Sequence, residues 1–272
     1  MSQFDEEDGL ILDPDSVGHR ARKRFGQNFL QDFRVIDRIV QAVAPLDDDQ
    51  LVEIGPGLGA LTGPLLRAAG KLTVVELDRD LAAGLPQRLG YPQTLTLVEA
   101  DALKTDFCSL VRGEGQLRVV GNLPYNISTP ILFHLISQSR CIHDMHFMLQ
   151  KEVVDRIVAT PGTKDYGRLS VMVQYHCQPT FLFEVPPGAF NPPPKVTSAV
   201  FRLQPYGVKP IQAKDEQRFA QIVHHVFTQR RKTLRNSLKN WIAPQAFEAL
   251  SIDPMTRPEM LSVGQFVALS DY

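Results

Sequence analysis

The residues best suited to chemistry stand at the ends of four short apolar runs between residues 51 and 125. The first run is followed by three glycines, the second ends in a carboxylate, the third is followed by another carboxylate and the fourth ends in an amide. In chain order these residues are Gly55, Gly57 and Gly59, Glu76, Asp101 and Asn122. Ligands of open α/β sheets bind at the carboxyl ends of the strands. If the four runs are parallel strands of one sheet, these groups share one site.

The glycines and the two acids predict an adenosine site. Glycine lets the chain turn tightly and approach a ligand without a Cβ atom in the way. The spacing is G-x-G-x-G, whereas dinucleotide sites have G-x-G-x-x-G. A carboxylate at Glu76 can accept both hydroxyl protons of a ribose, and one at Asp101 can accept an adenine amino proton. We therefore predict an adenosine without phosphates, with Leu77 and Ala102, which follow the two acids, also at the cofactor.

The segment Asn122-Leu123-Pro124-Tyr125 follows the fourth run. The exocyclic amine of a nucleobase is a poor nucleophile because its lone pair is delocalised into the ring. The Asn122 side-chain oxygen and the Leu123 carbonyl can accept hydrogen bonds from its two N–H groups. These hydrogen bonds favour a pyramidal nitrogen. Pro124 fixes φ, and stacking of an extruded base on Tyr125 contributes about 1–3 kcal/mol. The segment is predicted to clamp a base amine.

The elements that must position these residues follow from the apolar pattern. From residue 51 short apolar runs alternate with helical segments, which predicts βαβ units and a parallel sheet. Two later strand-like runs, residues 174–185 and 198–205, can close the sheet as an antiparallel edge pair. After them the pattern becomes helical, with apolar residues at i, i+3, i+4, i+7 and i+8: Phe219, Ile222, Val223, Val226 and Phe227.

We divide the chain into an acidic, disordered tail over residues 1–19, an α/β catalytic domain over residues 20–206 and a small all-α domain over residues 207–272. Residues 1–15 carry six acidic side chains and no basic one. The rest of the chain has a net charge of +5, so the whole chain has a formal net charge of −1. A basic remainder suits a polyanionic partner. The longest charge-free run, residues 119–139, is too polar to cross a bilayer and no secretory signal opens the chain, so we expect a cytoplasmic protein.

Metal and disulfide chemistry are not expected. Cys108, Cys141 and Cys177 are widely spaced without a Cys-x-x-Cys, which argues against a disulfide framework and against a zinc site, so we expect reduced thiols in the core. His143 and His146 have the ligand spacing of a helix but lie in a strand-like segment without nearby cysteines, so no metal is predicted there.

The chain resembles the S-adenosylmethionine-dependent ribosomal RNA adenine dimethyltransferases. The resemblance rests on segments that follow the family's order from about residue 22 to residue 203: RKRFGQNFL, EIGPGLGALT, ELD, EADAL, GNLPYNISTPIL, LQKEVVDRI, YGRLSVMVQ and FNPPPKVTSAV. It implies a Rossmann-like methyltransferase fold, mostly parallel with an antiparallel edge strand, and a small helical C-terminal domain. It implies methyl transfer from S-adenosylmethionine to N6 of two adjacent adenosines in a hairpin near the 3′ end of small-subunit ribosomal RNA.

The same resemblance assigns roles to individual residues. The cofactor would contact residues from five segments: Asn28, Leu30, Gly55, Gly57, Glu76, Leu77, Asp101, Ala102 and Asn122. The catalytic motif would be Asn122, Leu123, Pro124 and Tyr125, and Phe190 would face Tyr125 across the target base. The partner would be the small-subunit RNA of a pre-assembled subunit, bound by a monomer without metal or membrane.

Two basic runs are predicted to contact RNA phosphates. They comprise seven residues: Arg22, Lys23 and Arg24, and Arg231, Lys232, Arg235 and Lys239. In the second run Arg231, Arg235 and Lys239 recur every four residues and would share one face of a helix. Leu234, Leu238 and Trp241 would anchor an adjoining face.

Three other functions stay open at this point. A large-subunit ribosomal RNA adenine methyltransferase of the erythromycin-resistance type would look alike around the cofactor, although RKRF before GQNFL and the FNPPPKVTSAV segment favour the small-subunit family. An RNA-binding assembly or transcription factor could keep the fold without turnover, but the intact Glu76, Asp101 and Asn122 argue against lost chemistry. A nicotinamide dehydrogenase is disfavoured by the glycine spacing.

Overall fold

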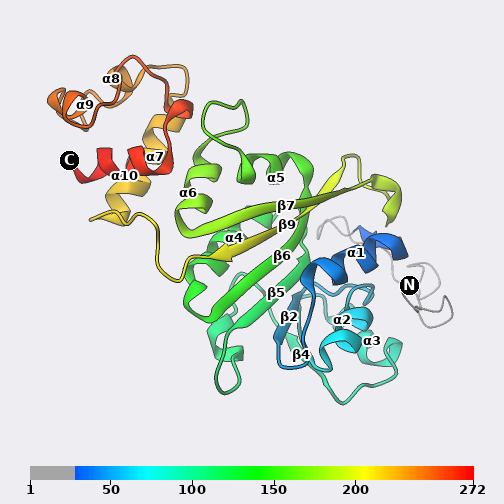
Figure 1. Cartoon of the computed structure of the whole chain (residues 1–272). Helices are drawn as coiled ribbons and strands as arrows, with labels where there is room; N and C mark the ends of the chain where they lie inside the picture. The colour runs from blue at the N-terminus through cyan, green and yellow to red at the C-terminus, as the bar shows by residue number, and fades with distance from the viewer. Residues whose placement is uncertain (1–27) are drawn as a thin grey trace. The chain divides into compact units, whose positions relative to one another are not determined.

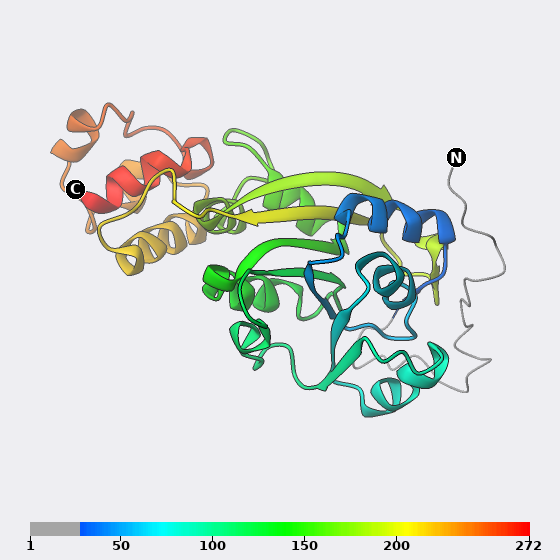
Figure 2. The same cartoon turned by 60° about the horizontal axis from the view of Figure 1, so that its bottom comes forward.

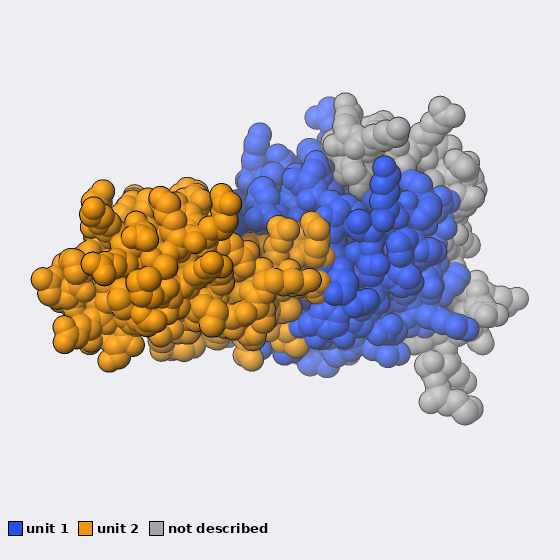
Figure 3. Space-filling view, turned by 90° about the horizontal axis from the view of Figure 1, so that it is seen from above, with its two compact units in different colours: residues 1–151, 181–204 blue, residues 152–180, 205–272 orange. Residues whose placement is uncertain are grey.

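The computed structural model describes residues 28–272, so the predictions made for the acidic tail and for Arg22, Lys23 and Arg24 lie outside the described residues. The chain forms two compact units, one of residues up to 151 with 181–204 and one of residues 152–180 with 205–272 (Figure 3). The second unit includes residues 152–180, which the sequence pattern did not assign to it.

A central sheet of seven strands, counted over the described residues, has the order β4-β3-β2-β5-β6-β9-β7 (Figure 1). The strands are β2 (Gln50–Ile54), β3 (Leu72–Glu76), β4 (Leu95–Glu99), β5 (Leu117–Asn122), β6 (Ile142–Gln150), β7 (Cys177–Val185) and β9 (Ser198–Pro205). The five strands from β4 to β6 pair in parallel, and β9 is antiparallel to β6. The predicted mostly parallel sheet with an antiparallel edge is confirmed.

Three helices pack on one face of this sheet, namely α1 (Phe33–Val43), α2 (Thr62–Ala69) and α3 (Arg79–Arg88) (Figures 1 and 2). Their buried side chains, such as Ile36, Leu65 and Leu85, form one cluster with Val74 and Val120 of the strands. The strand residues that alternate with these, among them Val52, Val75 and Val119, are buried as well. Burial on both faces explains the nearly continuous apolar runs of the parallel strands.

Helix α4 (Ser128–Ser137) follows β5, and α5 (Lys151–Val158) follows β6. A short second sheet joins β1 (Phe29–Leu30) to β8 (Phe190–Asn191) in antiparallel register. The peptide bond from Asn191 to Pro192 is cis. The β1–β8 pair was not predicted, because two-residue strands leave no periodic pattern in a sequence.

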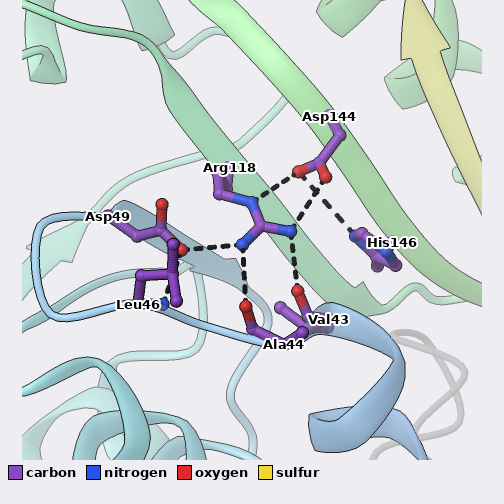
Figure 4. Close-up of polar contacts among 7 residues, drawn as sticks. All are labelled: Val43, Ala44, Leu46, Asp49, Arg118, Asp144 and His146. Atoms are coloured by element: carbon purple, nitrogen blue, oxygen red, sulfur yellow. Dashed lines mark hydrogen bonds and ion pairs between the residues drawn. The ribbon is translucent and has the colours of Figure 1, made fainter.

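The start of β5 is fixed by a partly buried arginine, Arg118, whose side chain is 12% exposed (Figure 4). Its guanidinium donates to both carboxylate oxygens of Asp144, at 2.9 Å each, and to Asp49 at 2.7 Å. It also donates to the carbonyl oxygens of Val43 and Ala44, at 2.6 and 3.3 Å. These carbonyls end α1 and have no partner within the helix, so one side chain joins α1, the turn before β2, β5 and β6.

His146 lies beside this network and is neutral. Its Nδ1 is 3.9 Å from Asp144, and burial lowers the pKa of the imidazole to about 4. His143 is exposed, and it lies at an irregularity of the β5–β6 register, where Leu117 pairs with Ile142 and Arg118 pairs with Asp144. Within residues 28–272 no cluster of His, Cys, Asp and Glu side chains could hold a metal ion.

The second unit is helical, with α6 (Arg168–His176), α7 (Glu216–Thr228), α8 (Leu234–Ser237), α9 (Gln245–Ala249) and α10 (Val263–Asp271). The predicted amphipathic helix is confirmed as α7, which buries Phe219, Ile222, Val223 and Val226 in a core shared with α10. Its first turn is capped by Asp215, whose carboxylate accepts the Arg218 N–H at 2.9 Å. Residues 174–176 belong to α6, so the strand predicted from residue 174 begins only at Cys177.

The expectation of three reduced thiols is wrong for two of them. Cys108 and Cys141 form a disulfide, with Cα atoms 5.4 Å apart. They lie in two short 3₁₀ helices, Phe107–Leu110 and Ser139–Cys141, which the Gln138 side chain also joins by accepting the Phe107 N–H at 2.7 Å. The fold brings together residues 33 apart in sequence, and spacing rules do not show that. Cys177 is free and buried, as expected.

No helix among residues 28–272 has the length and apolar character to cross a membrane.

Candidate active site

A cavity of about 280 Å³ lies at the carboxyl ends of β2, β3 and β5 and beside the turn after β4. Its walls include every residue predicted to contact the cofactor: Asn28, Leu30, Gly55, Gly57, Glu76, Leu77, Asp101, Ala102 and Asn122. Leu123, Pro124 and Tyr125 line it too. The parallel strands thus bring four separate sequence segments to one edge of the sheet.

The glycine turn after β2 forms the floor of this cavity. Gly55, Gly57 and Gly59 have φ of +66°, +58° and +95°, a region that favours glycine. A Cβ on Gly57 would lie 3.3 Å from the ring of Phe29, and one on Gly59 would lie 2.9 Å from a methyl of Leu85. The turn therefore packs too closely under β1 and α3 for larger residues.

Glu76 ends β3 and is buried, with 7% of its surface exposed. One carboxylate oxygen accepts the Asp78 N–H at 2.9 Å and the other accepts the Gly57 N–H at 3.3 Å. Burial raises the pKa of Glu76, and these N–H groups oppose the rise by favouring the carboxylate. Each oxygen keeps a lone pair, so Glu76 can still accept the two hydroxyls of a ribose.

Asp101 and its neighbours suit an adenine ring. One oxygen of Asp101 accepts the Leu103 N–H at 3.0 Å, which holds the carboxylate at the cavity wall. Leu77 is 51% exposed although it is apolar, while Ala102 is only 8% exposed. An exposed leucine and a small residue beside an acceptor offer a flat apolar slot for a purine whose amino group meets Asp101.

Asn122 is oriented by a hydrogen bond to the backbone of Asn28. Its side-chain N–H₂ group donates to the Asn28 carbonyl at 3.2 Å, so the amide oxygen is the atom that stays directed elsewhere in the cavity. Behind it, β5 runs against the end of β2, where a Cβ on Gly121 would lie 2.7 Å from the Ile54 carbonyl oxygen. The Leu123 N–H donates to the Met148 carbonyl at 3.3 Å.

Tyr125 is half-buried, and its hydroxyl hydrogen-bonds the Ser198 hydroxyl at 3.0 Å. Burial raises the pKa of the phenol, with the bond to Ser198 opposing the rise. The Ser128 hydroxyl donates to the Tyr125 carbonyl at 3.0 Å at the start of α4. Both ends of the tyrosine are therefore held while its ring borders the cavity.

Phe190 is not brought to the cavity. Its side chain is 4% exposed and packs with Leu30 and Val35 in the core cluster under α1, where β8 pairs with β1. In this structure it supports the strand that carries Leu30 into the site. The predicted contact of Phe190 with a target base opposite Tyr125 stays a prediction.

Glu53 is a site residue that the sequence reasoning missed. It is 2% exposed, lies in β2 two residues before Gly55 and lines the cavity. Burial raises the pKa of its carboxyl to about 8, the charge of Glu76 adds to the rise and the hydroxyl of Thr62 opposes it. A single acid inside the apolar run LVEI was the signal that could have revealed it, because an unpaired acid within a buried strand carries a large desolvation cost.

The second basic run differs from its prediction in one respect. Arg231, Lys232, Arg235 and Lys239 are all exposed, and Leu234 and Leu238 are buried in the core of their unit. They do not share a helical face, since α7 ends at Thr228 and α8 has only four residues. The N–H groups of Leu234 and Arg235 donate to the Thr256 and Pro254 carbonyls at 2.9 Å, which ends any continuous helix there. The RNA contacts of these residues stay a prediction.

Comparisons with known proteins bear on the whole chain. A family model described as ribosomal RNA adenine dimethylase matches residues 18–272. The ribosomal RNA small subunit methyltransferase A of Acinetobacter baylyi is 69% identical over 260 residues, 96% of this chain and 95% of the relative. The protein of the same name from Pseudomonas aeruginosa is 54% identical over 253 residues, 93% and 94% of the two chains.

Two solved structures share the fold. A dimethyladenosine transferase from Plasmodium falciparum has a TM-score of 0.76 at 28% identity, over 89% of this chain and 95% of that one. The 23S rRNA methyltransferase ErmE has a TM-score of 0.71 at 26% identity, over 90% and 98%. The methyl donor is S-adenosylmethionine, and the groups that line the cavity suit its adenosine. The chain belongs to the ribosomal RNA adenine dimethylase family.

Proposed function

We propose that this protein transfers methyl groups from S-adenosylmethionine to N6 of two adjacent adenosines in a hairpin near the 3′ end of small-subunit ribosomal RNA. The product is N6,N6-dimethyladenosine, formed within a partly assembled small subunit. The proposal draws on the relatives named ribosomal RNA small subunit methyltransferase A and on the geometry of the cavity.

The observation that carries the proposal is the orientation of Asn122. Because its N–H₂ group donates to the Asn28 carbonyl, its oxygen serves as an acceptor at the rim of a cavity that fits an adenosine donor. Tyr125, on the same rim, offers a ring whose hydroxyl is held by Ser198. An acceptor and a flat ring side by side suit an extruded base with a free amino group.

The residues of the chain act by positioning and polarising the acceptor. S-adenosylmethionine supplies a methyl group that its sulfonium makes electrophilic. The Asn122 side-chain oxygen and the Leu123 carbonyl accept hydrogen bonds from the N–H groups of the adenine amine. The lone pair of the amine is therefore localised on its nitrogen while the new N–C bond forms and the S–C bond of the donor breaks. One proton leaves the nitrogen for each methyl added. Pro124 holds the Leu123 carbonyl because its ring restricts the backbone.

The second candidate is methylation of large-subunit RNA, and the fold shared with ErmE is the observation behind it. That similarity is 26% in sequence identity, against 69% for the relative from A. baylyi, which covers nearly the whole chain. The small-subunit substrate is therefore the better supported of the two.

The test offers labelled S-adenosylmethionine together with unmethylated small subunits, with large-subunit RNA, or with no RNA, followed by nucleoside analysis. The expected result is label in N6,N6-dimethyladenosine from small subunits alone. Label in large-subunit RNA would favour the second candidate. Donor binding without any labelled nucleoside would show an RNA-binding factor that does not turn over.

A further inference from the structure

The loop after β4, residues 100–106, carries the predicted adenine acceptor Asp101 into the wall of the cavity. It contains only a short turn, in which the Asp101 carbonyl accepts the Lys104 N–H at 2.8 Å and the Thr105 hydroxyl at 2.9 Å. These bonds close the turn but do not attach it to a helix or a strand. A side chain on a loop keeps a precise direction only where neighbouring elements hold the loop, so the direction of Asp101 depends on the contacts of Thr105.

Thr105 is held by two side chains from the end of helix α4. The His134 Nε2 atom lies 2.8 Å from the Thr105 carbonyl oxygen, and the imidazole packs edge-on against the buried Phe107 with ring centroids 6.1 Å apart. The Gln138 Nε2 atom lies 3.2 Å from the same carbonyl oxygen and 2.9 Å from the imidazole Nε2. A carbonyl oxygen only accepts and has two lone pairs, so it takes both bonds when the imidazole carries its proton on Nε2.

Helix α4 is a rigid support for the loop. A different face of the helix from that of His134 buries Ile131, Leu132 and Leu135. The helix starts three residues after Tyr125, whose carbonyl accepts the Ser128 hydroxyl. One helix therefore holds the predicted base clamp at its start and the Asp101 loop at its end. His134 does not line the cavity, so any effect that it has on the donor passes through Thr105.

We propose that His134 is a positioning residue for the adenine of the donor: by holding Thr105 it sets the direction of the Asp101 carboxylate, and with it the preference of the site for adenine over a 6-oxopurine. This inference rests on the proposed function, since it takes S-adenosylmethionine as the donor. Adenine presents an N–H donor at C6, whereas a 6-oxopurine presents a carbonyl acceptor. A carboxylate held in place binds the first and repels the second, and one that turns away discriminates less.

Isothermal titration calorimetry measures this preference as the ratio of two dissociation constants. The two ligands are S-adenosylhomocysteine and its inosine analogue, in which a carbonyl replaces the amino group at C6 of the purine. Both ligands bind the same folded protein, so a variant that only unfolds more readily loses affinity for both alike and keeps the ratio. A change in the ratio therefore reports on the direction of Asp101 and not on stability.

Wild type should prefer the adenosine form by at least about tenfold. His134→Leu keeps an apolar side chain against Phe107 but has no donor, and it should lower this preference by on the order of fivefold. His134→Gln can place an amide N–H near the position of the imidazole Nε2 and should keep most of the preference. The matched control is Ser137→Ala on the same helix, which removes the bond from the Ser137 hydroxyl to the His134 carbonyl at 2.7 Å and should leave the preference unchanged.

An unchanged preference in His134→Leu, or equal losses in His134→Leu and His134→Gln, would overturn the inference while leaving the proposed function intact. A wild type that binds both ligands equally well would overturn it too. Failure of wild type to bind S-adenosylhomocysteine at all would instead overturn the proposed function. If His134→Leu does not fold, Thr105→Val removes the hydroxyl that bonds the Asp101 carbonyl and should also lower the preference. A preference in Thr105→Val equal to that of wild type would contradict the inference.

Discussion

Replacing Glu53 by Gln should stabilise the ligand-free protein, and the gain should grow with pH. The folded-state pKa of Glu53 is about 8, above the ordinary value of 4.5. The folded protein therefore holds a proton that the unfolded chain releases above pH 4.5. This bound proton contributes to the free energy of unfolding. The contribution has its full value below pH 4.5 and is lost as the pH rises through 8. Gln does not titrate, so the variant keeps its stability over the same range.

The size of the effect follows from the shift. One pKa unit corresponds to about 1.4 kcal/mol, so the rise from 4.5 to about 8 amounts to about 5 kcal/mol in total. Between pH 5.5 and pH 7.5 the difference in unfolding free energy between Glu53→Gln and wild type should grow by on the order of 2–3 kcal/mol. Contributions from titrating groups that do not interact with Glu53 cancel in this difference, whereas that of Glu76, whose charge acts on Glu53, cancels only in part.

Urea unfolding followed by far-UV circular dichroism measures the two free energies at several pH values. Tryptophan fluorescence is unsuitable, because the single Trp241 lies in the second unit and Glu53 in the first. The exposed Glu114→Gln should show no such pH-dependent gain. A difference between Glu53→Gln and wild type that stays constant from pH 5.5 to 7.5 would refute the reasoning, since it would mean that Glu53 is ionised in the folded protein.

Three further predictions concern the catalytic rim and the base of the sheet. Asn122→Ala should lower the methyl-transfer rate by on the order of 10²–10³ with donor affinity largely kept, measured by single-turnover kinetics and calorimetry; near-normal turnover would contradict the clamp. Tyr125→Ala should weaken RNA capture and turnover, whereas Tyr125→Phe, which loses only the bond to Ser198, should keep most of both; equal effects of the two variants would rule out stacking. Arg118→Met should destabilise the first unit by about 3–5 kcal/mol in urea unfolding, because two carboxylates lose their buried partner. The exposed Arg79→Met should cost less than about 1 kcal/mol, and similar losses for both would be evidence against the network.

The sequence allowed the sheet and the cofactor cavity to be predicted because both depend on local patterns. Apolar runs that alternate with helical segments define a parallel sheet, and the residue at each strand end then falls at a common edge. Glu76 and Asp101 could be found in this way without any knowledge of the tertiary structure, and both line the cavity.

Features that depend on distant partners could not be predicted. The Cys108–Cys141 disulfide and the Arg118 network form only once the fold has placed their members side by side. The break between α7 and α8 arises because the Thr256 carbonyl takes an N–H that a continuous helix would use itself. The raised pKa of Glu53 likewise depends on complete burial, which its residue type alone does not indicate.

A crystal structure with bound S-adenosylmethionine tests the central claim most directly. We predict that the ribose lies at Glu76, that the adenine lies at Asp101 and that the sulfonium methyl group points toward Asn122 and Tyr125. Donor density anywhere else on the chain, or a methyl group directed away from Asn122, would contradict the proposed clamp.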